Sequence, residues 1–184
     1  MYKPREDRIY LTGHSMGGHG AWYLGATYPD QWGAIGPAAG WINFWSYGGA
    51  VAFDNPDPIE TMLLRVASPS DPLKFVENYS ALGVYVLHGD ADDTVPVKQA
   101  RNMREKLGAF HRDVDFFEQP GGGHWYDSTP EPGADCVDYG PMFEFFDKHR
   151  RRLSKDVRSF KFSTVCPQVN ATCYWASIHA QTAQ

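Results

Sequence analysis

Apolar and polar positions along the chain form blocks that predict strands and helices in turn. Short, nearly continuous apolar runs predict buried parallel strands, and longer blocks bounded by Asp, Pro or Gly predict helices. The predicted strands cover residues 8–12, 34–37, 83–89 and 113–119, and the predicted helices cover residues 16–28, 58–67, 71–79, 97–107 and 142–153. Strands that alternate with helices are typical of an α/β fold with a parallel sheet and flanking helices.

The pattern changes after Leu153. The stretches VRSFKFSTV and CYWASIHAQ alternate polar and apolar residues and contain no block of helical length, which favours strands. We therefore divide the chain into a domain over residues 1–153 and a β-rich extension over residues 154–184. The sequence ends within a strand-like stretch, so we expect this extension to be truncated.

Composition and charge indicate a globular protein without an obvious polyanionic or membrane partner. Hydrophobic residues make up 42% of the chain and charged residues 21%, which is ordinary for a soluble domain. The net charge of −5 gives no reason to expect nucleic acid or an anionic membrane as partner, and we interpret the basic run at 148–152 as a helix end. No apolar run reaches the ~18 residues of a membrane span, and the charged first residues do not resemble a signal peptide.

Cysteine usage predicts neither a metal site nor a dense disulfide framework. The chain has three cysteines, and no pair or Cys/His cluster has zinc-binding spacing. We therefore expect no metal and no other cofactor. Cys166 and Cys173 could form a disulfide in an exported protein or remain two thiols, and both alternatives stay open.

A serine lies between glycines where the first predicted strand meets the first predicted helix. The sequence GHSMGG contains the Gly-x-Ser-x-Gly pattern of a nucleophile elbow. In an elbow, Ser15 would occupy a strained turn and project its hydroxyl above the sheet, and large side chains at Gly13 and Gly17 would clash, while Gly18 would help the helix pack closely. The helix N-terminus aims N–H groups beside Ser15, so the Met16 N–H is a candidate oxyanion donor. The alternative is a passive serine in a glycine-rich turn.

A serine hydroxyl needs a base to take its proton and an acid to orient that base. Two later loops fit, because each follows a predicted strand and would lie at the carboxyl edge of the sheet. PGGGHWYD supplies His124, while His14 and His88 are interpreted as structural or solvated histidines. The residue pattern does not choose among the three acids of the other loop, HGDADDTVP. These acids are Asp90, Asp92 and Asp93.

Together, GHSMGG, HGDADDTVP and GGGHW resemble the α/β-hydrolase superfamily. They most resemble its prolyl-oligopeptidase-like branch (peptidase family S9) and the related carbohydrate-associated esterases, over about residues 8–153. The resemblance implies Ser15 as nucleophile, Asp92 as orienting acid and His124 as base. It also implies further strands and a second oxyanion donor before the elbow. We therefore expect the C-terminal half of an α/β-hydrolase fold, in a fragment of a larger secreted or periplasmic hydrolase, with an exposed apolar edge at strand 8–12.

Aromatic residues near the predicted site are candidates for substrate contacts. Trp41 and Trp45 follow strand 34–37, and Trp125 adjoins His124, although a purely structural aromatic cluster is the alternative. Such a wall suits a proline ring, a phenolic ester or a sugar face equally. We predict a serine hydrolase that acts through an acyl-enzyme, first as an S9-like peptidase. The alternatives are a carboxylesterase for carbohydrate-linked or phenolic esters and a non-catalytic fragment or binding module.

Overall fold

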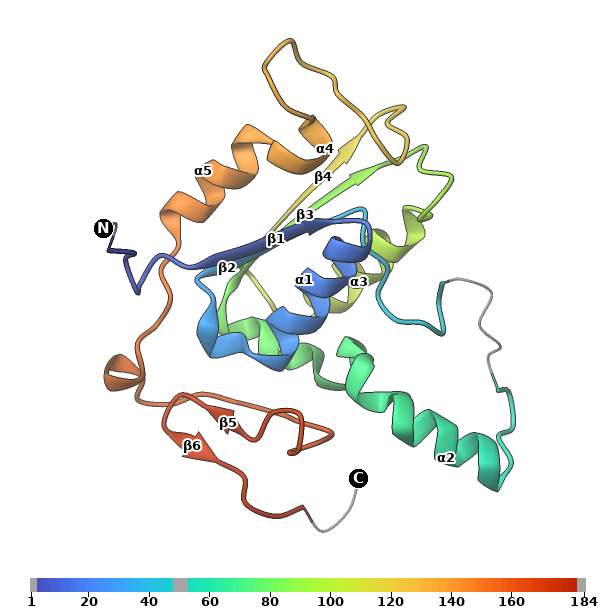
Figure 1. Cartoon of the computed structure of the whole chain (residues 1–184), viewed down its shortest axis with the longest axis vertical. Helices are drawn as coiled ribbons and strands as arrows, with labels where there is room; N and C mark the ends of the chain where they lie inside the picture. Colours follow the sequence, from blue (N-terminus) through green and yellow to red (C-terminus); the bar gives the residue numbers. More distant parts are fainter. Residues whose placement is uncertain (1–2, 48–52, 182–184) are drawn as a thin grey trace.

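The computed structural model describes residues 3–47 and 53–181 of the chain. A parallel sheet lies at the centre of these residues, and β1 lies at one end of it (Figure 1). Its four strands are, in spatial order, β1 (Tyr10–His14), β2 (Ala34–Ala38), β3 (Gly83–Gly89) and β4 (Val114–Gln119). Every pairing between neighbours is parallel. The sheet confirms the predicted α/β class, because strand order in space equals strand order in sequence and every carboxyl end lies at one edge.

Helices cover both faces of the sheet and make a three-layer structure (Figure 1). One face carries α1 (Met16–Thr27), the 3₁₀ helix η3 (Pro72–Ala81) and α3 (Lys98–Gly108); the other carries α4 (Asp135–Asp138) and α5 (Gly140–Lys148). Successive strand side chains point to opposite faces. Accordingly, Val84 and Val86 pack with the first group of helices, while Tyr85 between them packs with α5. This alternation explains why β3 is buried along its whole length.

The core beneath α1 is organised around two aromatic side chains. Trp22 and Tyr79 are both buried, and their rings meet edge to face with centroids 5.5 Å apart. The Tyr79 hydroxyl donates a hydrogen bond to the Trp22 carbonyl oxygen at 2.6 Å. Burying a side chain of this size contributes about 1.5–3 kcal/mol. The pair therefore fixes α1, and with it the serine at its N-terminus, against the rest of the domain.

Two helix predictions need correction. The predicted helix at 71–79 is the 3₁₀ helix η3, which is kinked at Phe75. The predicted helix at 142–153 is wrong in its last part, because α5 ends at Lys148 and His149 is extended. The His149 ring lies 2.6 Å from the Phe145 carbonyl oxygen and satisfies that helix-end acceptor. Most of the basic run at 148–152 therefore lies outside the helix.

The helix α2 (Pro58–Ala67) extends away from the sheet (Figure 1). Asp57 begins it with a capping box: its carboxylate accepts from Ile59 N and Glu60 N at 2.7 and 2.8 Å, and Glu60 accepts from Asp57 N at 2.9 Å. No residue of this helix is buried. Local capping rather than core packing therefore sets its start. The remaining short 3₁₀ helices are η1 (Pro29–Gln31), η2 (Ser68–Ser70) and η4 (Ser154–Asp156).

Residues 157–181 are mostly irregular, with the short antiparallel strands β5 (Thr172–Cys173) and β6 (Ala176–Ser177). The strand expected in VRSFKFSTV (157–165) is wrong, because that stretch is irregular. Asn78 anchors this segment: its amide donates to the Ser163 carbonyl oxygen at 2.8 Å and its oxygen accepts from Ser163 N at 2.9 Å. Asn170 donates to the Thr27 carbonyl oxygen at the end of α1. The segment thus packs on the sheet domain, and its treatment as a separate extension from residue 154 stays a prediction.

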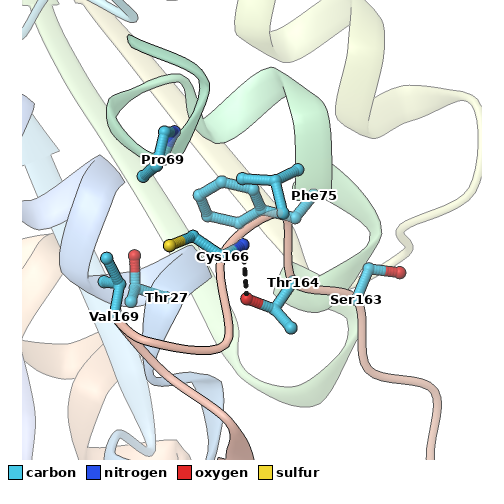
Figure 2. Close-up of a pocket in the computed structure, with 8 residues that line it drawn as sticks. Thr27, Pro69, Phe75, Ser163, Thr164, Cys166 and Val169 are labelled. Carbon is cyan, nitrogen blue, oxygen red and sulfur yellow. Dashed lines mark hydrogen bonds between the residues drawn. The ribbon is translucent and has the colours of Figure 1, made fainter. Parts of the chain in front are cut away.

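A small pocket lies where this segment crosses the domain (Figure 2). Thr27 and Phe75 face the stretch 163–169 across it, and Cys166 N donates to Thr164 Oγ1 at 3.3 Å. All three cysteines are free in the structure, so Cys166 and Cys173 form no disulfide here. Thr27 ends α1 whereas Ser15 precedes its start, so the pocket and the serine lie at opposite ends of that helix.

Candidate active site

Ser15 occupies the sharp turn between β1 and α1. It is the N-cap residue of α1 and has φ 59° and ψ −115°, a backbone conformation that is costly for a residue with a Cβ atom. Its N–H donates to the Ala38 carbonyl oxygen at 2.9 Å, and its own carbonyl oxygen accepts from His19 N at 3.0 Å. These two bonds hold the turn between the end of β2 and the first turn of the helix. The local geometry is that of a nucleophile elbow.

Glycines permit this turn, but not all for the expected reason. A Cβ atom at Gly18 would overlap the Ala38 carbonyl oxygen and the backbone of Gly40, and one at Gly13 would lie 2.5 Å from the Gly17 oxygen. Gly17 itself has open space where a side chain would be. The expectation of a clash at Gly17 is therefore wrong. Position 13 requires glycine because a Cβ atom there would overlap the backbone of Gly17.

Three side chains from three different loops meet at the carboxyl edge of the sheet. Nε2 of His124 lies 2.9 Å from Ser15 Oγ, and Nδ1 of the same ring lies 2.8 Å from Asp92 Oδ2. A carboxylate only accepts, so the ring donates through Nδ1 and presents its Nε2 lone pair to the serine hydroxyl. The Asp92 side chain is fully buried and the His124 side chain nearly so. The arrangement can take a proton from Ser15 and stabilise the resulting imidazolium.

Asp92, and neither of its neighbours, contacts His124. Its second oxygen accepts from Thr94 N at 2.9 Å and Val95 N at 2.8 Å, which fixes the carboxylate in a turn of its own loop. Asp90 accepts from Gly121 N at 2.6 Å and thereby ties its loop to the loop of the histidine. Asp93 is exposed and contacts Thr94 Oγ1 at 3.3 Å. The three acids thus have three different surroundings.

Two histidines that the sequence pattern marks as structural or solvated contact these residues. His88 is fully buried; its Nε2 donates to the Val95 carbonyl oxygen at 2.8 Å and lies 3.3 Å from Asp92 Oδ2. Burial lowers the pKa of His88. His14 Nε2 lies 2.8 Å from the carbonyl oxygen of His124. Both histidines lie at strand ends on the edge where the loops converge, and that position was the available signal.

The predicted aromatic contacts differ in their surroundings. Trp125 is 68% exposed and its ring lies against His14, with centroids 4.1 Å apart. Trp41 is buried and stacks on His19 and Tyr47 at 4.9 and 4.6 Å. Trp45 meets Phe53, with centroids 5.9 Å apart. Of the three tryptophans, Trp125 directly adjoins His124 and has an open face.

The predicted oxyanion donor begins α1. Met16 is the first residue of that helix and is 73% exposed. The first N–H groups of a helix have no partner within it and point toward the helix end. The Met16 N–H is therefore placed at the end of the helix that Ser15 caps. Its use by an oxyanion stays a prediction.

Within residues 3–47 and 53–181, no group of three or more His, Cys, Asp and Glu side chains could hold a metal ion. In the same residues, no helix has the length and apolarity to cross a membrane. Neither observation identifies a partner.

The parallel sheet, the elbow and the loops that follow β3 and β4 define the α/β-hydrolase class. The sequence profile of the prolyl oligopeptidase family matches residues 4–152, which is most of the chain. The chain therefore belongs to the prolyl oligopeptidase family.

Individual relatives are longer than this chain. An uncharacterized secreted protein of Arthroderma benhamiae is 32% identical over 117 residues, which are 63% of this chain and 13% of that protein. The uncomplexed acylaminoacyl peptidase of Pyrococcus horikoshii has a TM-score of 0.59 at 20% identity, over 85% of this chain and 26% of its own. A thermostable esterase has a TM-score of 0.54 at 22% identity, over 82% of this chain and 33% of its own. The chain thus spans a third or less of each.

Proposed function

We propose that the chain is a serine hydrolase that cleaves peptide or ester bonds with Ser15, His124 and Asp92. The single observation that carries this proposal is the position of the His124 ring, within hydrogen-bond distance of Ser15 Oγ on one side and Asp92 Oδ2 on the other. A serine is a poor nucleophile unless a positioned base takes its proton. The strained turn at Ser15 adds support, since strain of this kind concentrates at functional sites.

In the first step, Ser15 Oγ forms a bond to the substrate carbonyl carbon while its proton moves to His124 Nε2. The carbonyl oxygen becomes an oxyanion, to which the Met16 N–H donates. Collapse of this intermediate breaks the bond to the leaving amine or alcohol, which receives the proton from His124. Asp92 remains ionised throughout and stabilises the imidazolium. The product is an acyl-Ser15 enzyme.

In the second step, water repeats the same chemistry on the acyl-enzyme. His124 takes a proton from the water molecule as its oxygen attacks the acyl carbon. The ester bond to Ser15 breaks, and Ser15 Oγ regains the proton from His124. Two moderate barriers thus replace one high barrier, which is the purpose of a covalent intermediate.

We favour an S9-like peptidase because the chain belongs to the prolyl oligopeptidase family. The second candidate is a carboxylesterase for carbohydrate-linked or phenolic esters. The open face of Trp125 beside His124 supports this candidate as well as the first, since an aromatic platform suits a phenolic or sugar-like group as well as a proline ring. Trp41 and Trp45 remain proposed substrate contacts in either case.

Hydrolysis of two substrate types tests the proposal and separates its candidates. We expect the chain to hydrolyse a p-nitrophenyl ester or a proline-containing peptide amide, and Ser15→Ala to abolish either activity. A higher kcat/KM for the amide supports the peptidase, and a higher value for the ester supports the carboxylesterase. Turnover that survives in Ser15→Ala contradicts the proposal. A folded wild-type chain that turns over neither substrate supports the remaining alternative, a non-catalytic module.

A further inference from the structure

One imidazole of the nucleophile turn reaches across to the loop that carries the base. His14 is the last residue of β1 and immediately precedes Ser15. Its Nε2 lies 2.8 Å from the main-chain carbonyl oxygen of His124. Its ring centroid lies 4.7 Å from that of His124 and 4.1 Å from that of Trp125. The same residue thus contacts the backbone of His124 and the ring of the following residue.

The hydrogen bond defines the protonation of the His14 ring. A carbonyl oxygen only accepts, so Nε2 carries the proton and donates. Burial lowers the pKa of His14, with the hydrogen bond to His124 opposing that effect, and the neutral ring then has a lone pair at Nδ1. Nδ1 is buried and has no partner among the residues that the structure describes. His14 therefore donates to His124 through Nε2, whereas the hydroxyl of Ser15 is paired with the His124 ring.

The base needs support beyond Asp92. His124 lies in an irregular loop, directly after the glycine run 121–123, and glycines allow a loop many backbone conformations. Asp92 holds one atom of the ring, Nδ1. The loop backbone before it is tied by Asp90 to Gly121 N and by Ala91 N to the Gly122 oxygen, and neither of these bonds involves the backbone of His124 itself. The bond from His14 fixes that backbone relative to the residue beside the nucleophile. Ring and main chain of His124 are thus held by different elements.

We propose that His14 is a positioning residue that sets the distance between His124 and Ser15 through its hydrogen bond to the His124 carbonyl oxygen. The inference rests on the proposed function, in which that distance governs proton transfer. A misplacement of about 1 Å in such a group can cost about 10²-fold in rate. The contact of His14 with Trp125 is secondary and orients the exposed tryptophan beside the site.

Two substitutions distinguish the effect of the hydrogen-bond donor of His14 from the effect of its aromatic ring. In His14→Gln, the side-chain amide can still donate to the His124 carbonyl oxygen, whereas in His14→Phe the ring remains against Trp125 and the donor is lost. The rate at which a fluorophosphonate modifies Ser15 measures activation of the nucleophile. We expect His14→Phe to slow it by about tenfold to hundredfold and His14→Gln to stay within a few-fold of wild type. In steady-state hydrolysis, kcat of His14→Phe should fall and its KM should change little, because the lost hydrogen bond affects only the transition state.

Two results overturn the proposal, provided that circular dichroism and thermal unfolding show folded variants. One is modification of His14→Phe at the wild-type rate. The other is an equal loss in His14→Gln and His14→Phe, which would mean that any change at this position disturbs the turn.

A measurement on the unsubstituted protein covers the case in which a variant fails to fold. ¹⁵N NMR of the histidine rings should show His14 protonated at Nε2 and unprotonated at Nδ1. The opposite tautomer overturns the proposal, because the donor to His124 would then be absent. Together with the fluorophosphonate assay, this spectrum separates the two hypotheses. If Ser15 does not react although His14 has the expected tautomer, the proposed function fails while the contact between His14 and His124 stands.

Discussion

The Asp92 carboxylate and the His124 imidazole meet at 2.8 Å, with Asp92 Oδ2 facing Nδ1 of the ring. Two backbone N–H groups of the Asp92 loop hold the other carboxylate oxygen. The Asp92 carboxylate is thereby fixed in position, as its proposed role of orienting His124 requires. This pair distinguishes Asp92 from the two acids next to it in sequence.

Replacing these acids one at a time should give very different activities. We expect Asp92→Asn to lower kcat by about 10⁴-fold, because the amide stabilises the wrong tautomer of His124. Asp93→Asn is the matched control and should retain nearly full activity, since Asp93 is exposed. The measurement is steady-state hydrolysis of the preferred substrate. Equal losses in both variants would contradict the assignment.

The tight approach of α1 to the end of β2 predicts a stability difference between adjacent glycines. Gly18→Ala should destabilise the domain by about 1–3 kcal/mol, because its Cβ would overlap the Ala38 oxygen and Gly40. Gly17→Ala meets no neighbour and should be neutral or stabilising by up to about 1 kcal/mol. Urea unfolding monitored by tryptophan fluorescence gives both values. A destabilised Gly17→Ala with a normal Gly18→Ala would contradict the described packing.

Buried and half-buried histidines predict loss of stability in mild acid. Burial lowers the pKa of four of them below the ordinary value of 6.5. The unfolded chain therefore binds protons that the folded chain does not, so stability is complete above about pH 6.5 and falls as pH decreases through that value. These histidines are His14, His19, His88 and His111.

Thermal unfolding between about pH 7.5 and pH 5 measures this effect. We expect Tm to decrease steadily below about pH 6.5. His111→Gln provides a control, because the amide can replace the donor to the Leu82 carbonyl oxygen at 3.0 Å and removes one titrating group. Its Tm should depend less steeply on pH. A Tm that does not change over this range would contradict the prediction.

The thiols should differ in reactivity rather than pair with one another. Burial raises the pKa of the Cys173 thiol to about 12, with nearby Asp30 adding to the effect. Cys166 is half-buried at the small pocket of Figure 2. Iodoacetamide at neutral pH should therefore modify Cys166 well before Cys173, as measured by peptide mass spectrometry. An intact mass lower by two hydrogens before reduction would indicate a disulfide and contradict the free thiols.

Local sequence patterns predicted much of the fold. The apolar runs predicted all the strands of the main sheet, because buried parallel strands leave a simple signature. The end of α5 was missed because it depends on distant partners: the His149 ring contacts Asp113 and Arg151 N donates to the Asp7 carbonyl oxygen. No local pattern reports such contacts. The 3₁₀ form of η3 could not be distinguished from an α-helix, because apolar residues at i and i+3 lie on one face in both helix types.

The residues of the candidate site could be predicted where they lie in a short sequence motif. Ser15 and His124 each lie in a short motif at the end of a strand. Asp92 could be chosen over its neighbours only by family resemblance, since the choice depends on the turn that directs its carboxylate. His14 and His88 were set aside because their roles lie in contacts with the backbone of other loops. In the sequence, the only indication of such contacts is that both histidines lie at the ends of predicted strands.

The most direct test of the account is the covalent modification of Ser15. The chain is incubated with a fluorophosphonate, digested, and mapped by mass spectrometry, with Ser15→Ala as control. We predict one adduct, on the peptide that contains Ser15, and none in the variant. A folded wild-type chain that remains unmodified, or an adduct that persists in Ser15→Ala, would contradict it.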